Sequence, residues 1–153
     1  MERHQVRWPA WVMAVLFLGY AAGKAVYAAQ GRLGFPGGPA VPPGEYERYT
    51  SEVMDVTTAQ WAAVATGVLA AALVLLTVTR VGRRVPRPLM LAVLGCALLG
   101  VGAGAAIVAA DGFIGLGVGW QWYHGVAMLA VTALLAATAW SYARATRRGP
   151  SRR

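Results

Sequence analysis

Lys24 is the residue whose chemical type and position most strongly suggest a functional site. It is the only lysine of the 153-residue chain, and it lies within an apolar run over residues 8–29. On a helix it shares a face with Tyr20 and Tyr27, while aliphatic residues occupy the opposite face. An ionisable side chain within a membrane span indicates function by default. The alternative is that its long stem carries the ammonium outward to the lipid headgroups.

A buried ammonium needs an acidic partner, because an uncompensated buried charge is costly. Asp111 is the first candidate, since it ends the third apolar run at a height similar to that of Lys24. Asp55 and Glu52 precede the second apolar run and are the other candidates. A simpler interpretation also exists, with Asp111 as a helix-terminating residue and Asp55 as the first residue of a helix.

His124 is a further candidate for a ligand or ion-pair site. It follows Trp120, Trp122 and Tyr123, and such an aromatic cluster is typical first of all of a membrane interface. His124 and Asp111 could form an acid–base pair, but the sequence places no nucleophile beside them. No spacing of ligand residues indicates a metal. We therefore expect no catalytic residue, no metal and no cofactor.

The composition is typical of a membrane protein. Hydrophobic residues make up 58% of the chain and charged residues 13%, against about 25% charged in soluble domains. The net charge of +8 does not indicate a nucleic-acid partner, because the arginines flank apolar runs and form no basic surface with interleaved aromatic residues. Thirteen arginines, one lysine and no asparagine indicate a GC-rich bacterial genome, such as that of an actinobacterium. The single cysteine, Cys96, excludes an internal disulfide.

The apolar runs predict an all-α fold. Each is long enough to cross about 30 Å of hydrocarbon. We expect an integral membrane four-helix bundle with spans at about 9–29, 56–79, 89–110 and 120–142. A cleaved signal peptide is the rival interpretation of the first run, but its apolar region would be only about 7–15 residues long.

The polar segments predict the rest of the organisation. A loop rich in glycine and proline covers 30–44, and a short interfacial helix at about 45–55 leads into the second span. Residues 1–142 form a single transmembrane domain, and residues 143–153 form a basic tail that we expect to be disordered.

The distribution of arginine predicts the orientation. Eleven of the thirteen arginines lie in 1–7, 80–88 and 143–153, together with a single acidic residue, whereas the other loops hold the remaining five acidic residues. Cytoplasmic segments carry the excess of arginine and lysine. We therefore expect both termini in the cytoplasm of a bacterial plasma membrane, with 30–55 and 111–119 facing outward.

Small residues at four-residue intervals predict close helix packing. Gly19 and Gly23 have the GxxxG spacing, as do Gly100 and Gly104, and Gly67 lies in a series of alanines with the same spacing. We expect these glycines to face other helices of the same chain. The alternative is a seam between two copies of the chain or with another membrane protein.

Two segments of the chain resemble each other. With a shift of 81 residues, 22–38 and 103–119 share eight identical residues. A duplicated helical hairpin would give this pattern, with both halves running the same way through the membrane. Chance is the alternative, because alanine and glycine are abundant.

The segment from Lys24 to Gly38, followed by Ala59-Gln60-Trp61 and Gly67, resembles small actinobacterial four-span membrane proteins of unknown function. The resemblance covers mostly residues 20–67 and implies a membrane fold without an activity. Small multidrug exporters have a carboxylate in their first helix, where this chain has a lysine, so we do not assign that activity.

We expect a non-enzymatic accessory, interaction or structural component of the cell envelope. Glycine seams and the lack of a complete catalytic set favour this role. The alternative is a small transporter or ligand-binding membrane protein with a polar site near the outer leaflet, formed by Lys24, Asp111 and His124.

Overall fold

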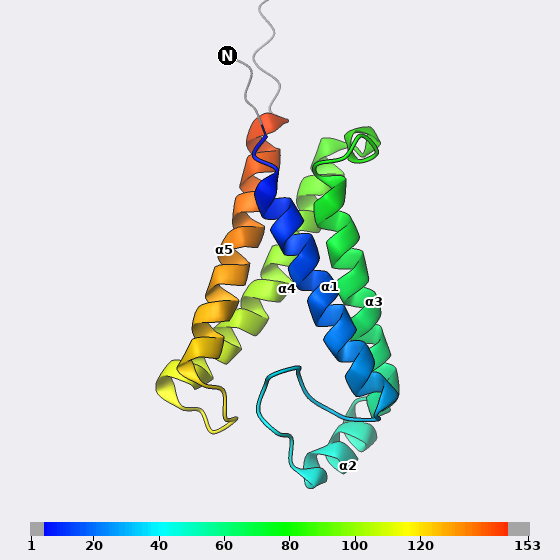
Figure 1. Ribbon diagram of the computed structural model, residues 1–153, viewed down its shortest axis with the longest axis vertical. Coiled ribbons are helices and arrows are strands. Elements are labelled where there is room, and N and C mark those ends of the chain that lie inside the picture. The colour runs from blue at the N-terminus through cyan, green and yellow to red at the C-terminus, as the bar shows by residue number, and fades with distance from the viewer. Residues whose placement is uncertain (1–4, 147–153) are drawn as a thin grey trace, which may run out of the picture.

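The computed structural model describes residues 5–146, and the structural statements below concern these residues. They form four long helices, a short helix and a 3-10 turn, without strands: α1 (Trp8–Ala29), α2 (Pro43–Glu52), α3 (Val56–Leu76), η1 (Gly82–Arg84), α4 (Arg87–Ile114) and α5 (Trp122–Ala145) (Figure 1). The four long helices are each apolar and long enough to cross a membrane. The predicted all-helical class is confirmed, while residues 147–153 of the predicted tail lie outside the described range.

The long helices pack as two pairs, α1 with α3 and α4 with α5. α1 also contacts α5, whereas α3 and α4 barely touch. The pairs meet where α1 begins and α5 ends, here called the convergent end, and separate toward α2, here called the divergent end (Figure 1). The two pairs correspond to the two halves of the suspected duplication, but α1 ends at Ala29, whereas α4 continues past the aligned Ala110.

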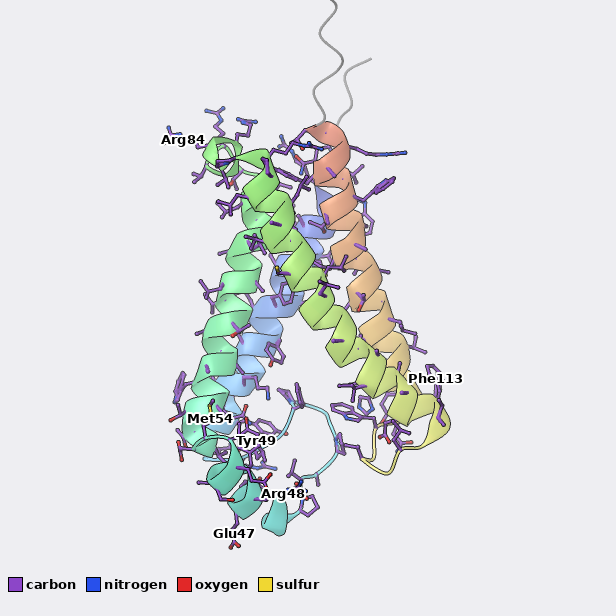
Figure 2. The ribbon with its side chains drawn as sticks, turned by 180° about the vertical axis from the view of Figure 1, so that it is seen from behind. Glu47, Arg48, Tyr49, Met54, Arg84 and Phe113 are labelled. Carbon is purple, nitrogen blue, oxygen red and sulfur yellow. The ribbon has the colours of Figure 1, made fainter. Side chains whose placement is uncertain are left out.

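The apolar core lies toward the convergent end. Met13, Val74 and Leu135 join α1, α3 and α5 and have no exposed surface. Leu94 and Tyr142 join α4 to α5 in a second cluster. The first loop, residues 30–42, lies between the two pairs at the divergent end (Figures 1 and 2). Core packing therefore holds one end of the molecule together, and a loop lies between the pairs at the other.

α4 ends later than predicted and α5 begins later than predicted, in both cases because of local capping. α4 continues to Ile114, so Asp111 lies within the helix and not in the expected loop; Gly115, with φ of 78°, ends the helix in the left-handed conformation. α5 begins at Trp122, because the side chains of Gln121 and His124 form a reciprocal capping box with the backbone.

Two other elements end earlier than predicted. α3 stops at Leu76 and not at residue 79, since the Thr77 hydroxyl donates to the Val74 carbonyl at 2.6 Å and the chain then turns tightly. Gly82 in that turn lies against the Leu76 backbone, where no side chain would fit. α2 starts at Pro43, a residue favoured in the first turn of a helix, and ends at Glu52.

Candidate functional site

Lys24 lies on the inner side of α1, and only 6% of it is exposed. Its Nζ donates to the Gly34 carbonyl at 2.6 Å and lies 3.9 Å from the centre of the Phe35 ring, a cation–π contact. A second ring, that of Tyr20, lies 5.8 Å away. Within residues 5–146 no acidic side chain pairs with the ammonium. Lys24 therefore adopts neither of the two arrangements considered from the sequence: it does not reach outward to water, and it does not pair with an acidic side chain of residues 5–146.

Gln60 of α3 binds the same stretch of loop. Its side-chain amide is almost fully buried, at 2% exposure, and donates to the carbonyls of Arg32 at 2.8 Å and Gly34 at 3.2 Å. The Gly34 carbonyl thus accepts hydrogen bonds from both α1 and α3. Pro36, two residues later, packs so closely on Gly23 of α1 that a side chain there would overlap the proline ring.

A cavity of about 420 Å³ lies beside Lys24. Its polar lining residues are Lys24, Gln60, Tyr20 and Tyr49. Apolar side chains from the first loop, from α3 and from the segment before α5 complete the wall: Leu33, Phe35, Pro39, Val41, Ala59, Ala63, Val118 and Trp120. No acidic residue among residues 5–146 lines it, and Lys24 is the one charged side chain that these residues contribute to the cavity.

Asp111 holds the second loop, residues 115–121, against the end of α4. It is 2% exposed, and its carboxylate accepts the backbone N–H groups of Val118 at 3.1 Å and Trp120 at 2.7 Å. These two bonds place Trp120, whose ring packs against Phe35 with ring centres 5.7 Å apart. Asp111 therefore acts on the Lys24 surroundings through Trp120 and not by direct contact.

His124 joins α5 to the first loop. Its Nδ1 accepts the Gln121 N–H at 3.1 Å, so in the neutral ring Nε2 carries the proton and donates to the Gly37 carbonyl at 2.9 Å. The ring also packs edge-on against Trp120, with centres 5.1 Å apart. Both ring nitrogens of His124 are therefore engaged, and within the described residues neither bonds to a side-chain hydroxyl or thiol.

Asp55 lies outside this cluster and caps α3. Its carboxylate accepts the Thr58 backbone N–H at 2.9 Å and the Thr58 hydroxyl at 3.1 Å. These bonds, led by the one from the backbone, hold the pKa of Asp55 below its ordinary value. The structure thus gives Asp55 the helix-start position.

The five glycines proposed for helix packing have different surroundings. A side chain at Gly67 would come within 3.0 Å of Ala21, so this glycine lets α3 approach α1 closely. Gly23 faces the loop residue Pro36 instead of a helix. At the remaining three positions, a Cβ atom would meet nothing within 4 Å: Gly19, Gly100 and Gly104.

Sequence reasoning missed three of the residues that build this region. Gln60 had a usable signal, because it is the only amide side chain in its apolar run and a buried amide needs partners. Phe35 had no such signal in the sequence, since the path of a loop depends on the elements around it. Gly125, where a side chain would lie 3.1 Å from the Ala109 backbone, is the close contact between α4 and α5.

The arrangement provides hydrogen-bond donors and apolar walls, which suit binding more than catalysis. In residues 5–146 no group of three acidic, histidine or cysteine side chains is placed to hold a metal ion. Comparison with protein-family models, curated proteins and solved structures finds no match to this chain.

Proposed function

We propose that the protein is a multi-pass protein of a bacterial plasma membrane, with both termini in the cytoplasm. The exposed apolar side chains of the long helices support insertion: Leu69 of α3 is 69% exposed, and Leu99 and Ile107 of α4 are 75% and 62% exposed. Large contiguous apolar faces are rare on soluble monomers. The described parts of the arginine-rich segments, which are Arg7, residues 80–87 and Arg144, lie at the convergent end and favour a cytoplasmic position for it.

The divergent end then faces outward, with α2 at the membrane surface. Arg48 of α2 pairs with Glu52 at 3.3 Å and with Glu45 at 3.9 Å, and all three side chains are exposed. Polar groups of this kind suit a helix at the lipid headgroups and not one within the hydrocarbon.

The role that we propose is non-enzymatic: the protein assembles with other membrane helices as an accessory or structural component of the envelope. The open glycine face of α4 carries this proposal. Gly100 and Gly104 lie about one turn apart, and a side chain at either position would meet nothing within 4 Å. Small residues at this spacing allow a second helix to approach closely.

A second copy of the chain is the occupant that we propose for this face. The same patch on two copies is self-complementary about a twofold axis, the usual arrangement of homodimers. Cys96 is exposed and lies one turn before Gly100, so it belongs to the same face of α4. A different membrane protein with a small-residue seam is the competing occupant.

Replacing Gly100 and Gly104 together with leucine tests the proposal. In bilayers, the fraction of dimers counted by single-molecule photobleaching should fall to the level of random coincidence. Thermal stability should hardly change, because no other part of the described chain packs there. Ala106→Leu, exposed on another side of α4, should leave the dimer intact. A wild-type protein that stays monomeric at every density would refute the dimer.

A further inference from the structure

The cavity beside Lys24 contains a positive charge that no negative charge balances. Lys24 is 6% exposed, and the described part of the chain contributes no aspartate or glutamate to the cavity lining. Four of the acidic residues at this end are engaged elsewhere: Asp111 with backbone N–H groups, Asp55 with Thr58, and Glu45 and Glu52 with Arg48. A buried ammonium without a counter-charge is costly, even when a carbonyl and an aromatic ring contact it.

Hydrogen-bond donors remain free around this charge. An ammonium has three N–H donors, and Lys24 uses one of them on the Gly34 carbonyl. Tyr20 and Tyr49 also line the cavity, and their hydroxyl groups make no hydrogen bond to residues 5–146. One cation and two phenolic donors form a set that suits a single anionic group.

The rest of the wall is apolar. Leu33, Val41 and Ala63 line it together with the aromatic rings of Phe35 and Trp120. The volume of about 420 Å³ falls within the range of small-molecule sites, roughly 300–1,000 Å³. The cavity therefore offers a charged donor group beside a larger apolar space.

We propose that this cavity binds a small amphipathic monoanion, a carboxylate attached to an apolar body. The carboxylate accepts hydrogen bonds from Lys24 and from the hydroxyl groups of Tyr20 and Tyr49, and the apolar body contacts the loop and α3. Such a ligand supplies the missing negative charge. It reaches the cavity either from water, as a short organic acid, or from the bilayer, as a fatty acid. The inference does not depend on dimer formation.

Calorimetric titration of the protein in nanodiscs of zwitterionic lipid tests this proposal. The probes are hexanoate, decanoate and the uncharged methyl esters of both acids. We expect saturable binding of one carboxylate per chain, and an ester should bind about tenfold more weakly or worse, since it lacks the charge. Binding of hexanoate would indicate a ligand from water. Binding of decanoate alone would indicate the bilayer, and binding of neither acid would overturn the proposal.

Two variants separate the site from general effects on the fold. Lys24→Met should weaken carboxylate binding about tenfold or more, while Arg32→Gln, a nearby cation that does not line the cavity, should leave it unchanged. Ala63→Phe should fill the cavity and abolish binding with Lys24 still in place. Its matched control is Ala62→Phe, on the exposed side of α3. Normal binding by both Lys24→Met and Ala63→Phe would place the ligand elsewhere and refute the site.

The dimerisation test and this one remain distinct. The Gly100→Leu, Gly104→Leu double variant should bind the carboxylate like the wild type, because neither glycine lines the cavity. Loss of dimers with normal binding supports both proposals. Loss of binding in this variant would show that the cavity needs the dimer, contrary to the inference.

Discussion

Lys24 and His124 hold the two ends of one four-residue loop segment from two different helix pairs. Lys24 of α1 donates to the Gly34 carbonyl at 2.6 Å, and His124 of α5 bonds to the Gly37 carbonyl at 2.9 Å. The segment between them therefore connects the pairs at the end where the helices separate. Figure 2 shows this loop between the helix pairs, at the divergent end of the molecule, where α2 also lies.

His124→Phe should loosen this connection. The substitution keeps an aromatic ring beside Trp120 but removes the bond to Gly37 and the cap of α5. Spin labels at Trp61→Cys and Ile114→Cys, both exposed, would report the distance between α3 and α4 in a Cys96→Ser background. We expect a broader distribution shifted to longer distances. Tyr123→Phe is the control, and an identical distribution in His124→Phe would contradict the role of the loop.

Gln60→Leu should destabilise the protein by about 1–3 kcal/mol, the usual cost of leaving buried polar groups without partners. The side chain is similar in volume, but the Arg32 carbonyl loses its bond at 2.8 Å. Gln30→Leu, at an exposed position, is the matched control and should have almost no effect. Reversible denaturation in mixed micelles, followed by circular dichroism, gives both values. Equal stability of the two variants would mean that Gln60 does not hold the loop.

The lowered pKa of Asp55 predicts a specific dependence of stability on pH. Its pKa in the folded protein lies below the unfolded value, which is about 3.9. Its contribution to stability is therefore complete above that value and is lost as the pH falls through the lower folded value. Asp55→Asn keeps a capping side chain without the titration.

The difference between the melting temperatures of the wild type and Asp55→Asn should accordingly be constant from pH 7 to about pH 5 and should shrink in acid, below about pH 4. Taking the difference removes the contributions of the other carboxylates. A difference that stays constant down to pH 2.5 would show that the bonds to Thr58 do not favour the ionised form in solution.

Some of this structure follows from sequence periodicity and some does not. The wheel of the first helix placed Lys24 beside Tyr20, and the structure has this contact. The hydrogen-bond acceptor of Lys24 could not be predicted from the sequence, because a loop whose path depends on α3 and α5 brings Gly34 to it. The sequence reasoning looked for a carboxylate, whereas the ammonium binds a backbone carbonyl, and every residue has one.

The glycines show the same limit. Gly67 and Gly100 both have small-residue spacing, yet only Gly67 meets another helix of this chain. Spacing shows that a helix has a smooth face but not what lies opposite it. Asp111 is a further case, since α4 continues past it and its carboxylate binds the N–H groups of the returning chain.

The proposed orientation can be tested by labelling from one side of the membrane. In a Cys96→Ser background, Ser51→Cys in α2 should react with an impermeant maleimide added to intact cells. Arg83→Cys in the turn η1 should react only after the cells are opened, because positive-inside placement puts η1 in the cytoplasm. The opposite pattern would invert the topology and place the Lys24 cavity on the cytoplasmic side.

Cross-linking through Cys96 in native membranes tests the proposed assembly most directly. The chain has one cysteine, which is exposed on the face of α4 that carries Gly100. Oxidation with copper phenanthroline should give a covalent dimer of the wild type, and the Gly100→Leu, Gly104→Leu variant should give none. Leu69→Cys in the Cys96→Ser background, equally apolar and 69% exposed on α3, should cross-link only at the rate of random collision. Equal cross-linking at both positions, or none at Cys96, would contradict the α4 dimer.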